Sequence, residues 1–342
     1  MENTQETTNK KQMSMDKFRI VCAILIVAIH IYPLASINEN LDFAFTHIFC
    51  RIGVPFFLMI SGFFVLPKAM ENRKILLKYT LKILIIYAIS IILFLPINIY
   101  SGKFQQLNVL GVLKEITITG TFYHLWYFPA LLLGIWIVYA ILKGIKNIKL
   151  QYFIVIILFI IGLFGDSYYK ISEQIPLIRK CYEVLFQVFN YTRNGLFYVP
   201  IFLYLGYRLR KKDFKISKKN NIIFLAIFIV LMIIEGMILH YYKIQKHDSM
   251  YIMLIPTMLF LFNLFKNEKQ ENRKNLRNIS TIMYITHPVF IIVVRGVAKV
   301  MHLENIMVEN SLIHYILVVI LTVVFSIVFE ICKEKVRNKV EK

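Results

Sequence analysis

Arg19 and His30 are two polar residues, eleven positions apart, in the first long apolar segment of the chain. An α-helix turns about 100° per residue, so eleven steps return almost to the starting direction, and we expect both side chains on one face, about 16 Å apart along the axis. An ionised side chain near the bilayer centre costs about 2.5–3.5 kcal/mol, so such residues face a protein interior or a wet cavity. His30 is therefore interpreted as a functional residue. Arg19, at the inner interface, could instead extend toward lipid phosphates.

The second apolar segment carries Arg51 followed by small residues at helical spacing, among them Gly53 and Ser61. Small residues on one stripe let helices approach closely, so the stripe, with Gly62, predicts tight packing against the first helix. Packing does not explain Arg51, which we expect near the outer interface. There it would balance an anionic substrate or pair with the acidic residues Glu39 or Asp42.

Two further histidines lie in apolar segments. His124 opens the fourth segment beside Trp126 and Tyr127, two residue types that serve equally as interfacial anchors or as site residues. In the ninth segment His287 precedes Pro288, which lacks an N–H and so frees a backbone carbonyl of the preceding turn. Both histidines are interpreted as site residues.

Glu235 is an acidic residue in the outer third of the seventh apolar segment. A carboxyl group there must be protonated, paired or open to water. We expect Arg51 or Arg193 to be its partner.

Composition defines the class of protein. The 342 residues are 58% hydrophobic and carry a formal charge of +20, a combination that excludes a soluble domain. The basic residues are spread through short loops instead of forming one face with aromatics, which argues against nucleic-acid binding. The cysteines are isolated, with no CxxC pair, so no metal site or disulfide framework is expected.

Hydropathy predicts an all-α, polytopic membrane protein. A window of about twenty residues gives ten transmembrane segments. Two of them are short, and one of these could be partly re-entrant. The ten segments are 18–36, 43–66, 75–98, 122–142, 150–165, 193–208, 221–242, 249–266, 279–300 and 312–332.

Loop charge predicts the orientation. Lys and Arg are concentrated in every second loop, on the side of the N-terminus, and by the positive-inside rule both termini are cytoplasmic. Residues 1–17 form a cytoplasmic tail, 18–332 the transmembrane domain and 333–342 a basic cytoplasmic tail. The first apolar run has no small-residue cleavage site and is typical of a retained signal anchor.

Three motifs resemble those of the membrane acyltransferase 3 family. They are Arg19-x10-His30, the run Gly53-Val-Pro-Phe-Phe-Leu-Met-Ile-Ser-Gly-Phe63, and Ser280-x3-Tyr284-x2-His287. Members of this family transfer acyl groups from cytoplasmic acyl-CoA to sugars and other acceptors across bacterial membranes. The resemblance covers essentially the whole chain and implies a multi-pass protein of a bacterial cell membrane.

A closer resemblance rests on the stretches 123–129, 165–167, 192–195 and 246–251. They are similar to the membrane half of the serine racemases of D-Ala-D-Ser vancomycin resistance. In those proteins this half is associated with L-serine uptake, and a cytoplasmic racemase domain follows it. We expect no racemase domain in the present chain, so a serine racemase partner would be a separate protein.

The family resemblance implies roles for individual residues. His30 is the implied catalytic residue, Arg19 lies at the acyl-CoA entrance, and Lys78 and Lys82 correspond to a basic pair that is arginine in many members. Lysine offers a point charge instead of a bidentate fork for phosphate. His124 is a second departure, since sugar O-acetyltransferases of the family usually have a carboxylate beside this tryptophan.

The sequence thus predicts acyl transfer, with acetyl as the expected group and acetyl-CoA as the donor. The acceptor would be a hydroxyl of a small molecule or an envelope glycan at the outer side. His30 would be the general base or transient acyl carrier, and His124 or His287 would stabilise charge. The predicted acceptor pocket comprises Arg51, Ser61, Trp126, Tyr127, Arg193 and Glu235.

Two alternatives remain open. The first is an L-serine transporter, in which Arg51 or Arg193 attracts the carboxylate and Glu235 or Asp248 the ammonium group. The second is a binding scaffold for a separate racemase or ligase, which the basic loop 208–219 could serve, although such a loop ordinarily signals topology and contact with anionic lipid.

Overall fold

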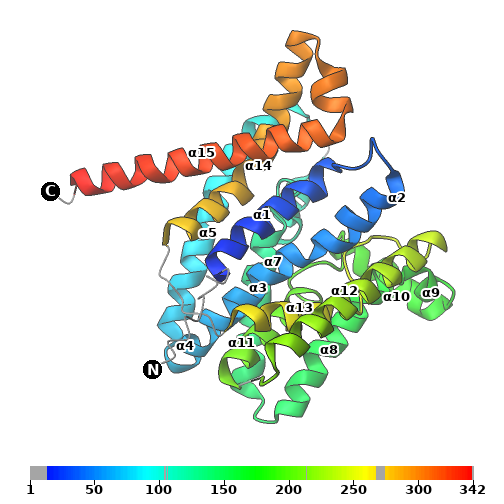
Figure 1. Cartoon of the computed structure of the whole chain (residues 1–342). Coiled ribbons are helices and arrows are strands. Elements are labelled where there is room, and N and C mark those ends of the chain that lie inside the picture. Colours follow the sequence, from blue (N-terminus) through cyan, green and yellow to red (C-terminus); the bar gives the residue numbers. More distant parts are fainter. Residues whose placement is uncertain (1–13, 104, 106, 213, 267–273, 341–342) are drawn as a thin grey trace, which may run out of the picture.

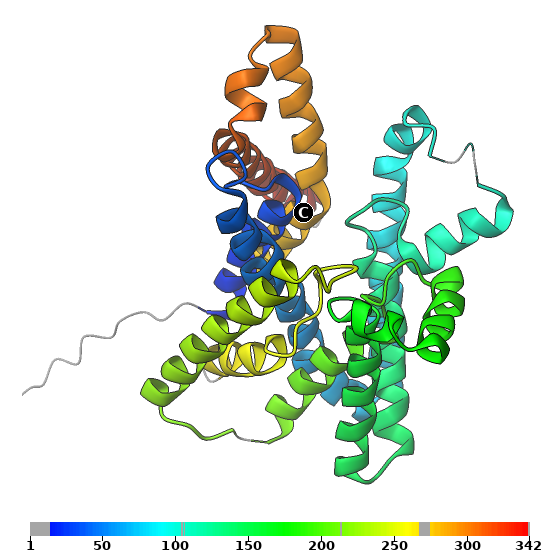
Figure 2. The ribbon, with the colours of Figure 1, turned by 90° about the vertical axis from the view of Figure 1, so that its right-hand side faces the viewer.

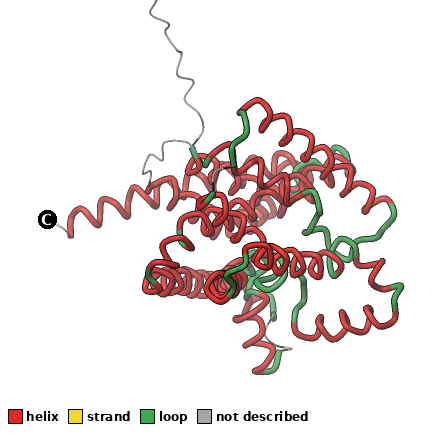
Figure 3. Tube along the Cα trace, turned by 90° about the horizontal axis from the view of Figure 1, so that it is seen from below, coloured by secondary structure: helices red, strands yellow, loops and turns green. Residues whose placement is uncertain are grey.

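A computed structural model describes residues 14–103, 105, 107–212, 214–266 and 274–340. Over these ranges the chain forms helices joined by loops, with no strand, as Figure 3 shows. The predicted all-α class is therefore confirmed. Residues 1–13 of the predicted N-terminal tail, 267–273 of the loop before the ninth segment and 341–342 of the C-terminal tail lie outside the described residues.

The helices follow one another along the whole chain. They are α1 (Met15–Ile31), α2 (Glu39–Asp42), η1 (Phe43–Ile48), η2 (Phe49–Ile52), α3 (Gly53–Phe64), α4 (Leu66–Glu71), α5 (Arg73–Tyr100), α6 (Val109–Lys114), η3 (Glu115–Thr119), α7 (Tyr127–Gly144), α8 (Ile148–Phe164), α9 (Tyr169–Glu173), α10 (Pro176–Val188), α11 (Val199–Lys211), α12 (Lys218–Tyr241), α13 (Leu254–Phe265), α14 (Lys274–Met301), η4 (Asn305–Glu309) and α15 (Ser311–Val340).

Six helical stretches in the described residues are long and apolar enough to cross a membrane, which makes the chain a multi-pass membrane protein. They are the continuous stretch from α2 to α4, and the helices α5, α7, α12, α14 and α15. The other predicted segments coincide with α1, α8, α11 and α13, which have 17, 17, 13 and 12 residues. These four are shorter than the roughly 20 residues that a crossing helix needs.

Three predicted segments differ from the helices for local reasons. The first helix ends at Ile31 because Tyr32 takes a left-handed φ of 60° and Pro33 follows it. The sixth begins only at Val199, since Asn194 accepts hydrogen bonds from the backbone of the next turn. The eighth begins at Leu254, after a loop whose backbone N–H groups donate to the carboxylates of Asp166 and Glu235 and so do not form helical hydrogen bonds.

Helix α1 lies in the middle of the molecule, beside α3 and against α14 (Figure 1). Seen from the side, α14 and α15 lie on one flank and α5 to α7 on the other (Figure 2). Helix α11 packs on α3, and the two contain a reciprocal glycine contact. A Cβ at Gly62 would overlap the carbonyl oxygen of Leu203, and a Cβ at Gly206 would overlap that of Met59.

The predicted packing of the small-residue stripe is confirmed in part. Gly53 faces α1, where an added Cβ would lie 3.2 Å from the carbonyl oxygen of Cys22. The expectation was wrong for Gly62, which faces α11. Ser61 hydrogen-bonds to the Tyr79 hydroxyl of α5 at 2.9 Å. The stripe therefore joins three neighbours of α3 and not one, because successive positions of a helix point in different directions.

Candidate functional site

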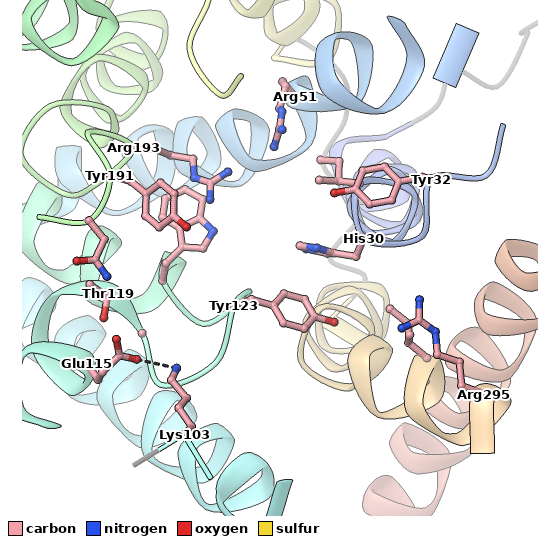
Figure 4. Close-up of a pocket in the computed structure, with 15 residues that line it drawn as sticks. His30, Tyr32, Arg51, Lys103, Glu115, Thr119, Tyr123, Tyr191, Arg193 and Arg295 are labelled. Carbon is pink, nitrogen blue, oxygen red and sulfur yellow. Dashed lines mark ion pairs between the residues drawn. The ribbon is translucent and has the colours of Figure 1, made fainter. Parts of the chain in front are cut away.

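A cavity of about 590 Å³, here called the His30 cavity, opens between α1, α14 and the loops before α7 and α11. Figure 4 shows His30, Arg51, Arg193 and Tyr123 around it. Four predicted site residues line this cavity: His30 in the last turn of α1, Arg51 in η2, Trp126 just before α7, and Arg193 before α11.

A second cavity of about 150 Å³, here called the Arg19 cavity, lies toward the other end of α1. Arg19, Lys82, Ser61 and Tyr127 line it together with Tyr284. The structure therefore separates the predicted acceptor pocket, because Ser61 and Tyr127 lie with the predicted acyl-CoA residues and not with Arg51. Helical spacing could not show this, since it assigns a face to each side chain but not a neighbour.

The three predicted catalytic histidines lie together between the cavities. The His30 and His287 rings are 5.3 Å apart at an interplanar angle of 20°, and His124 meets His287 at 5.2 Å and 73°. The Tyr284 hydroxyl donates a hydrogen bond to the His124 carbonyl oxygen. Since Tyr284 lines the Arg19 cavity and His30 lines the other, His124, Tyr284 and His287 form a layer between the cavities, called the histidine layer.

The hydrogen bonds of His287 fix its tautomer. Its Nδ1 lies 2.8 Å from the carbonyl oxygen of Tyr284, which can only accept, so Nδ1 carries the hydrogen. That carbonyl is four residues before Pro288, the proline inside α14, so the predicted free carbonyl is present. The buried Nε2 of His287 has no hydrogen-bond partner in the described part of the chain. It therefore presents a lone pair that can accept a proton.

The residues predicted to bind acyl-CoA differ in their position relative to the Arg19 cavity. Arg19 is only partly exposed and lies 3.8 Å from Asp16, which Arg277 also approaches at 4.0 Å. Lys82 lines the Arg19 cavity. Lys78, one turn earlier on α5, is exposed and is not among the residues that line either cavity.

Arg51 has a different partner from those expected. Its Nη2 lies 2.9 Å from Oδ1 of Asp248, and His47 contacts the other carboxylate oxygen. The expected pairing with Glu39 or Asp42 is wrong: the Asp42 carboxylate accepts hydrogen bonds from residues on either side of it in the chain. Asp248 is nearly two hundred positions from Arg51, so local spacing carried no signal of this pair.

Glu235 makes a structural contact. Its carboxylate accepts hydrogen bonds from the Tyr168 hydroxyl at 2.8 Å and from the backbone N–H groups of Ile252 and Met253 at 2.7 and 2.9 Å. The expected arginine partner was wrong. Glu235 is outside the residues that line the two cavities and ties the loop before α13 to α12.

Arg193 is held over an aromatic ring. Its guanidinium carbon lies 4.5 Å from the Trp126 ring centroid, and Nη1 donates to Ser249 Oγ at 3.0 Å. Asp166 fixes the Ser249 loop by accepting two backbone N–H bonds. In the same loop, burial lowers the pKa of His247, although the Asp166 carboxylate acts in the opposite direction. A histidine of lowered pKa is neutral at neutral pH and adds no charge there.

The structure adds residues that the sequence analysis did not single out. Lys103 and Glu115 form a 2.7 Å ion pair at the wall of the His30 cavity, and Arg295 of α14 also lines it. Lys103 and Glu115 belong to the segment between the third and fourth predicted transmembrane segments, which contains α6 and η3. A stretch without strong apolar periodicity gave no sign that it covers the site.

Comparison with known proteins finds a family model and relatives that match most of the chain. An acyltransferase domain model, that of the acyltransferase 3 family, matches residues 14–331. Two proteins of Enterococcus faecalis named amino-acid racemase are 40% and 38% identical over 314 and 316 residues, which are 91% and 90% of this chain. A serine/alanine racemase of Enterococcus gallinarum is 33% identical over 317 residues, again 91% of this chain.

The chain spans less than half the length of these relatives, since the matches cover 44%, 44% and 45% of them. No solved structure matches the chain.

Proposed function

This chain belongs to the acyltransferase 3 family, and we propose that it transfers an acyl group, expected to be acetyl, from cytoplasmic acyl-CoA to a hydroxyl acceptor at the outer side of the membrane. One observation carries the proposal: His30 of one cavity stacks on His287, whose neighbour Tyr284 lines the other cavity. A donor and an acceptor bound in the two cavities would meet at these side chains.

In the proposed topology the chain crosses the membrane ten times, with both termini in the cytoplasm. The crossings are the six long helical stretches together with α1, α8, α11 and α13. The short α11 and α13 each follow a loop packed inside the protein, and irregular backbone is tolerated at membrane depth where protein surrounds it. Arg19 then faces the inner side and His30 the outer side.

The donor would enter the Arg19 cavity. Arg19 and Lys82 supply positive charge for the phosphates of CoA, and the Nε of Arg19 makes no hydrogen bond within the described residues. The cavity is small, so we place only the pantetheine chain in it and put the nucleotide at the inner surface near the exposed Lys78.

The proposed transfer begins at the acceptor hydroxyl. The imidazole of His30 takes the proton of the acceptor hydroxyl, and the oxygen attacks the thioester carbonyl carbon. The carbon–sulfur bond breaks, and the leaving CoA thiolate takes a proton from the imidazolium. In the carrier variant the His30 nitrogen attacks the thioester carbonyl carbon and CoA leaves as the thiolate; the acceptor oxygen then takes the acyl group from that nitrogen, and the hydroxyl proton passes to the thiolate. His124 and His287 stabilise the charge in either route, and the histidine layer must open for the thioester to reach His30.

A second function, L-serine transport beside a separate racemase in a D-serine vancomycin-resistance system, is supported by the names of the relatives, one of which is a serine/alanine racemase. In this role the His30 cavity would hold the amino acid. No acyl donor would be needed.

The deciding experiment uses the purified chain in lipid vesicles. Acceptor-dependent release of CoA from acetyl-CoA is expected for the native protein and is expected to be lost in His30→Asn. His302→Asn, which changes an exposed histidine at the end of α14, is the matched control and should keep full activity. Uptake of labelled serine without acetyl-CoA, unchanged in His30→Asn, would establish transport, and absence of CoA release with every acceptor would exclude the acyltransferase.

A further inference from the structure

The His30 cavity contains more positive than negative charge. Two of its cations are matched by carboxylates: Arg51 by Asp248 at 2.9 Å and Lys103 by Glu115 at 2.7 Å. Glu115 is the acidic residue among those that line the cavity. Each of these pairs cancels its own charge, so neither leaves a cation for a ligand.

Arg193 and Arg295 also line this cavity, and no ion pair joins either of them to a carboxylate in the part of the chain that the structure describes. Asp166 is near Arg193, but it does not line the cavity and accepts hydrogen bonds from the backbone of Ser249 and Met250. Among the described residues, these two guanidinium groups of the cavity therefore have no carboxylate partner. Charges in a partly desolvated site attract a counter-ion more strongly than in water.

Arg193 is positioned to provide the contact. One face of its guanidinium lies on Trp126, one amino group is used by Ser249, and its buried Nε has no hydrogen-bond partner in the described residues. Figure 4 shows the guanidinium of Arg193 and the imidazole of His30 pointing toward the same open space. A carboxylate fits the planar donor edge of a guanidinium, with two parallel hydrogen bonds.

We propose, resting on the acyl transfer above, that the acceptor is a small hydroxy acid, whose carboxylate binds Arg193 while its hydroxyl lies beside His30. A neutral sugar would leave Arg193 without a carboxylate partner. In the reaction the acid keeps its carboxylate, loses the hydroxyl proton to His30 and gains the acyl group on that oxygen. The products are the O-acyl acid and CoA.

Binding is measured first, without any acyl donor. Trp126 lies against Arg193, and the chain has one other tryptophan, so Trp136→Phe leaves a single fluorescent reporter at the site. The protein is placed in phosphatidylcholine nanodiscs and titrated with L-lactate, L-serine and glycerol. We expect saturable changes with the two acids and none with glycerol.

Arg193→Gln should weaken binding of both acids at least about tenfold, the effect of losing one charge-assisted hydrogen bond. Arg179→Gln, at an exposed position of α10, is the matched control and should change nothing. Equal binding of glycerol and lactate, or equal affinity in Arg193→Gln, would overturn the proposal. So would loss of lactate binding in phosphatidylglycerol nanodiscs, because the site would then hold a lipid phosphate.

Acylation is measured second and separates this inference from the proposed function. Labelled acetyl-CoA should give O-acetyl-lactate or O-acetylserine, and the yield should fall in Arg193→Gln. If glycerol or a sugar is acetylated and neither acid is, the acyltransferase stands and the hydroxy-acid acceptor is wrong. If both acids bind through Arg193 and nothing is acetylated, acyl transfer fails and the acids bind only as ligands.

Discussion

His287 donates its Nδ1–H to the carbonyl oxygen of Tyr284 over 2.8 Å. In an uninterrupted helix that carbonyl would accept the N–H four residues later, but Pro288 has none. The break in the helix thus orients an imidazole and leaves its Nε2 as a proton acceptor next to the His30 ring.

Pro288→Ala should lower the transfer rate about tenfold while the protein becomes no less stable. The new N–H competes for the Tyr284 carbonyl, so the His287 tautomer is no longer fixed. The turnover number and the melting temperature are measured together. Pro96→Ala, at the proline inside α5, is the control. An unchanged rate in Pro288→Ala would show that the tautomer has no part in transfer.

Tyr284→Phe should uncouple the release of CoA from the transfer of the acyl group to the acceptor. The variant loses the hydrogen bond to the His124 carbonyl, worth about 1 kcal/mol, and so loosens the histidine layer. We expect CoA release without acceptor to rise and acceptor-dependent transfer to fall. Tyr315→Phe, which removes a hydroxyl bonded to the Ile24 carbonyl, is the comparison. If the two variants behave alike, the histidine layer does not prevent the donor from reacting without an acceptor.

Lys82 and Lys78 should differ in their effect on the donor. Lys82→Ala removes a charge from the wall of the Arg19 cavity and is expected to raise the KM for acetyl-CoA about five- to tenfold. Lys78→Ala removes an exposed charge and should change it less than about twofold. Initial rates at varied acetyl-CoA give both values. The reverse order would mean that Lys78 at the inner surface, and not Lys82 at the cavity wall, holds the phosphates of CoA.

Gly62→Ala should destabilise the protein by about 2 kcal/mol, because the added methyl group overlaps the Leu203 backbone and overpacking costs roughly 1–3 kcal/mol. Gly296→Ala is the control, since no atom lies within 4 Å of the added carbon. It should stabilise α14 by about 0.5–1 kcal/mol. Thermal unfolding in detergent measures both changes, and equal melting temperatures would contradict the close helix contact.

The sequence predicted what depends on local periodicity. Apolar length located the six long helical stretches, and the eleven-residue spacing predicted Arg19 and His30 on one face of one helix, where the structure puts each at a cavity of its own. It could not predict the Arg51–Asp248 pair or the position of Lys103 and Glu115, because these depend on how distant loops fold back on the bundle.

The division of the site into two cavities was also beyond the sequence. Ser61 and Tyr127 were expected beside Arg51, but both line the Arg19 cavity, where the Ser61 hydroxyl is hydrogen-bonded to that of Tyr79. A helix that passes between two cavities presents some residues to each. The packing of the neighbouring helices decides which residues face which cavity.

The reciprocal glycine contact has a consequence for motion. The backbones of α3 and α11 touch at Gly62 and Gly206, so the two helices cannot slide past each other without a collision. We therefore expect this pair to move as one rigid unit. Helix α14 has Pro288 inside it, and a helix bends more easily at a proline, so we expect bending in this bundle to be concentrated beside His287 and not between α3 and α11.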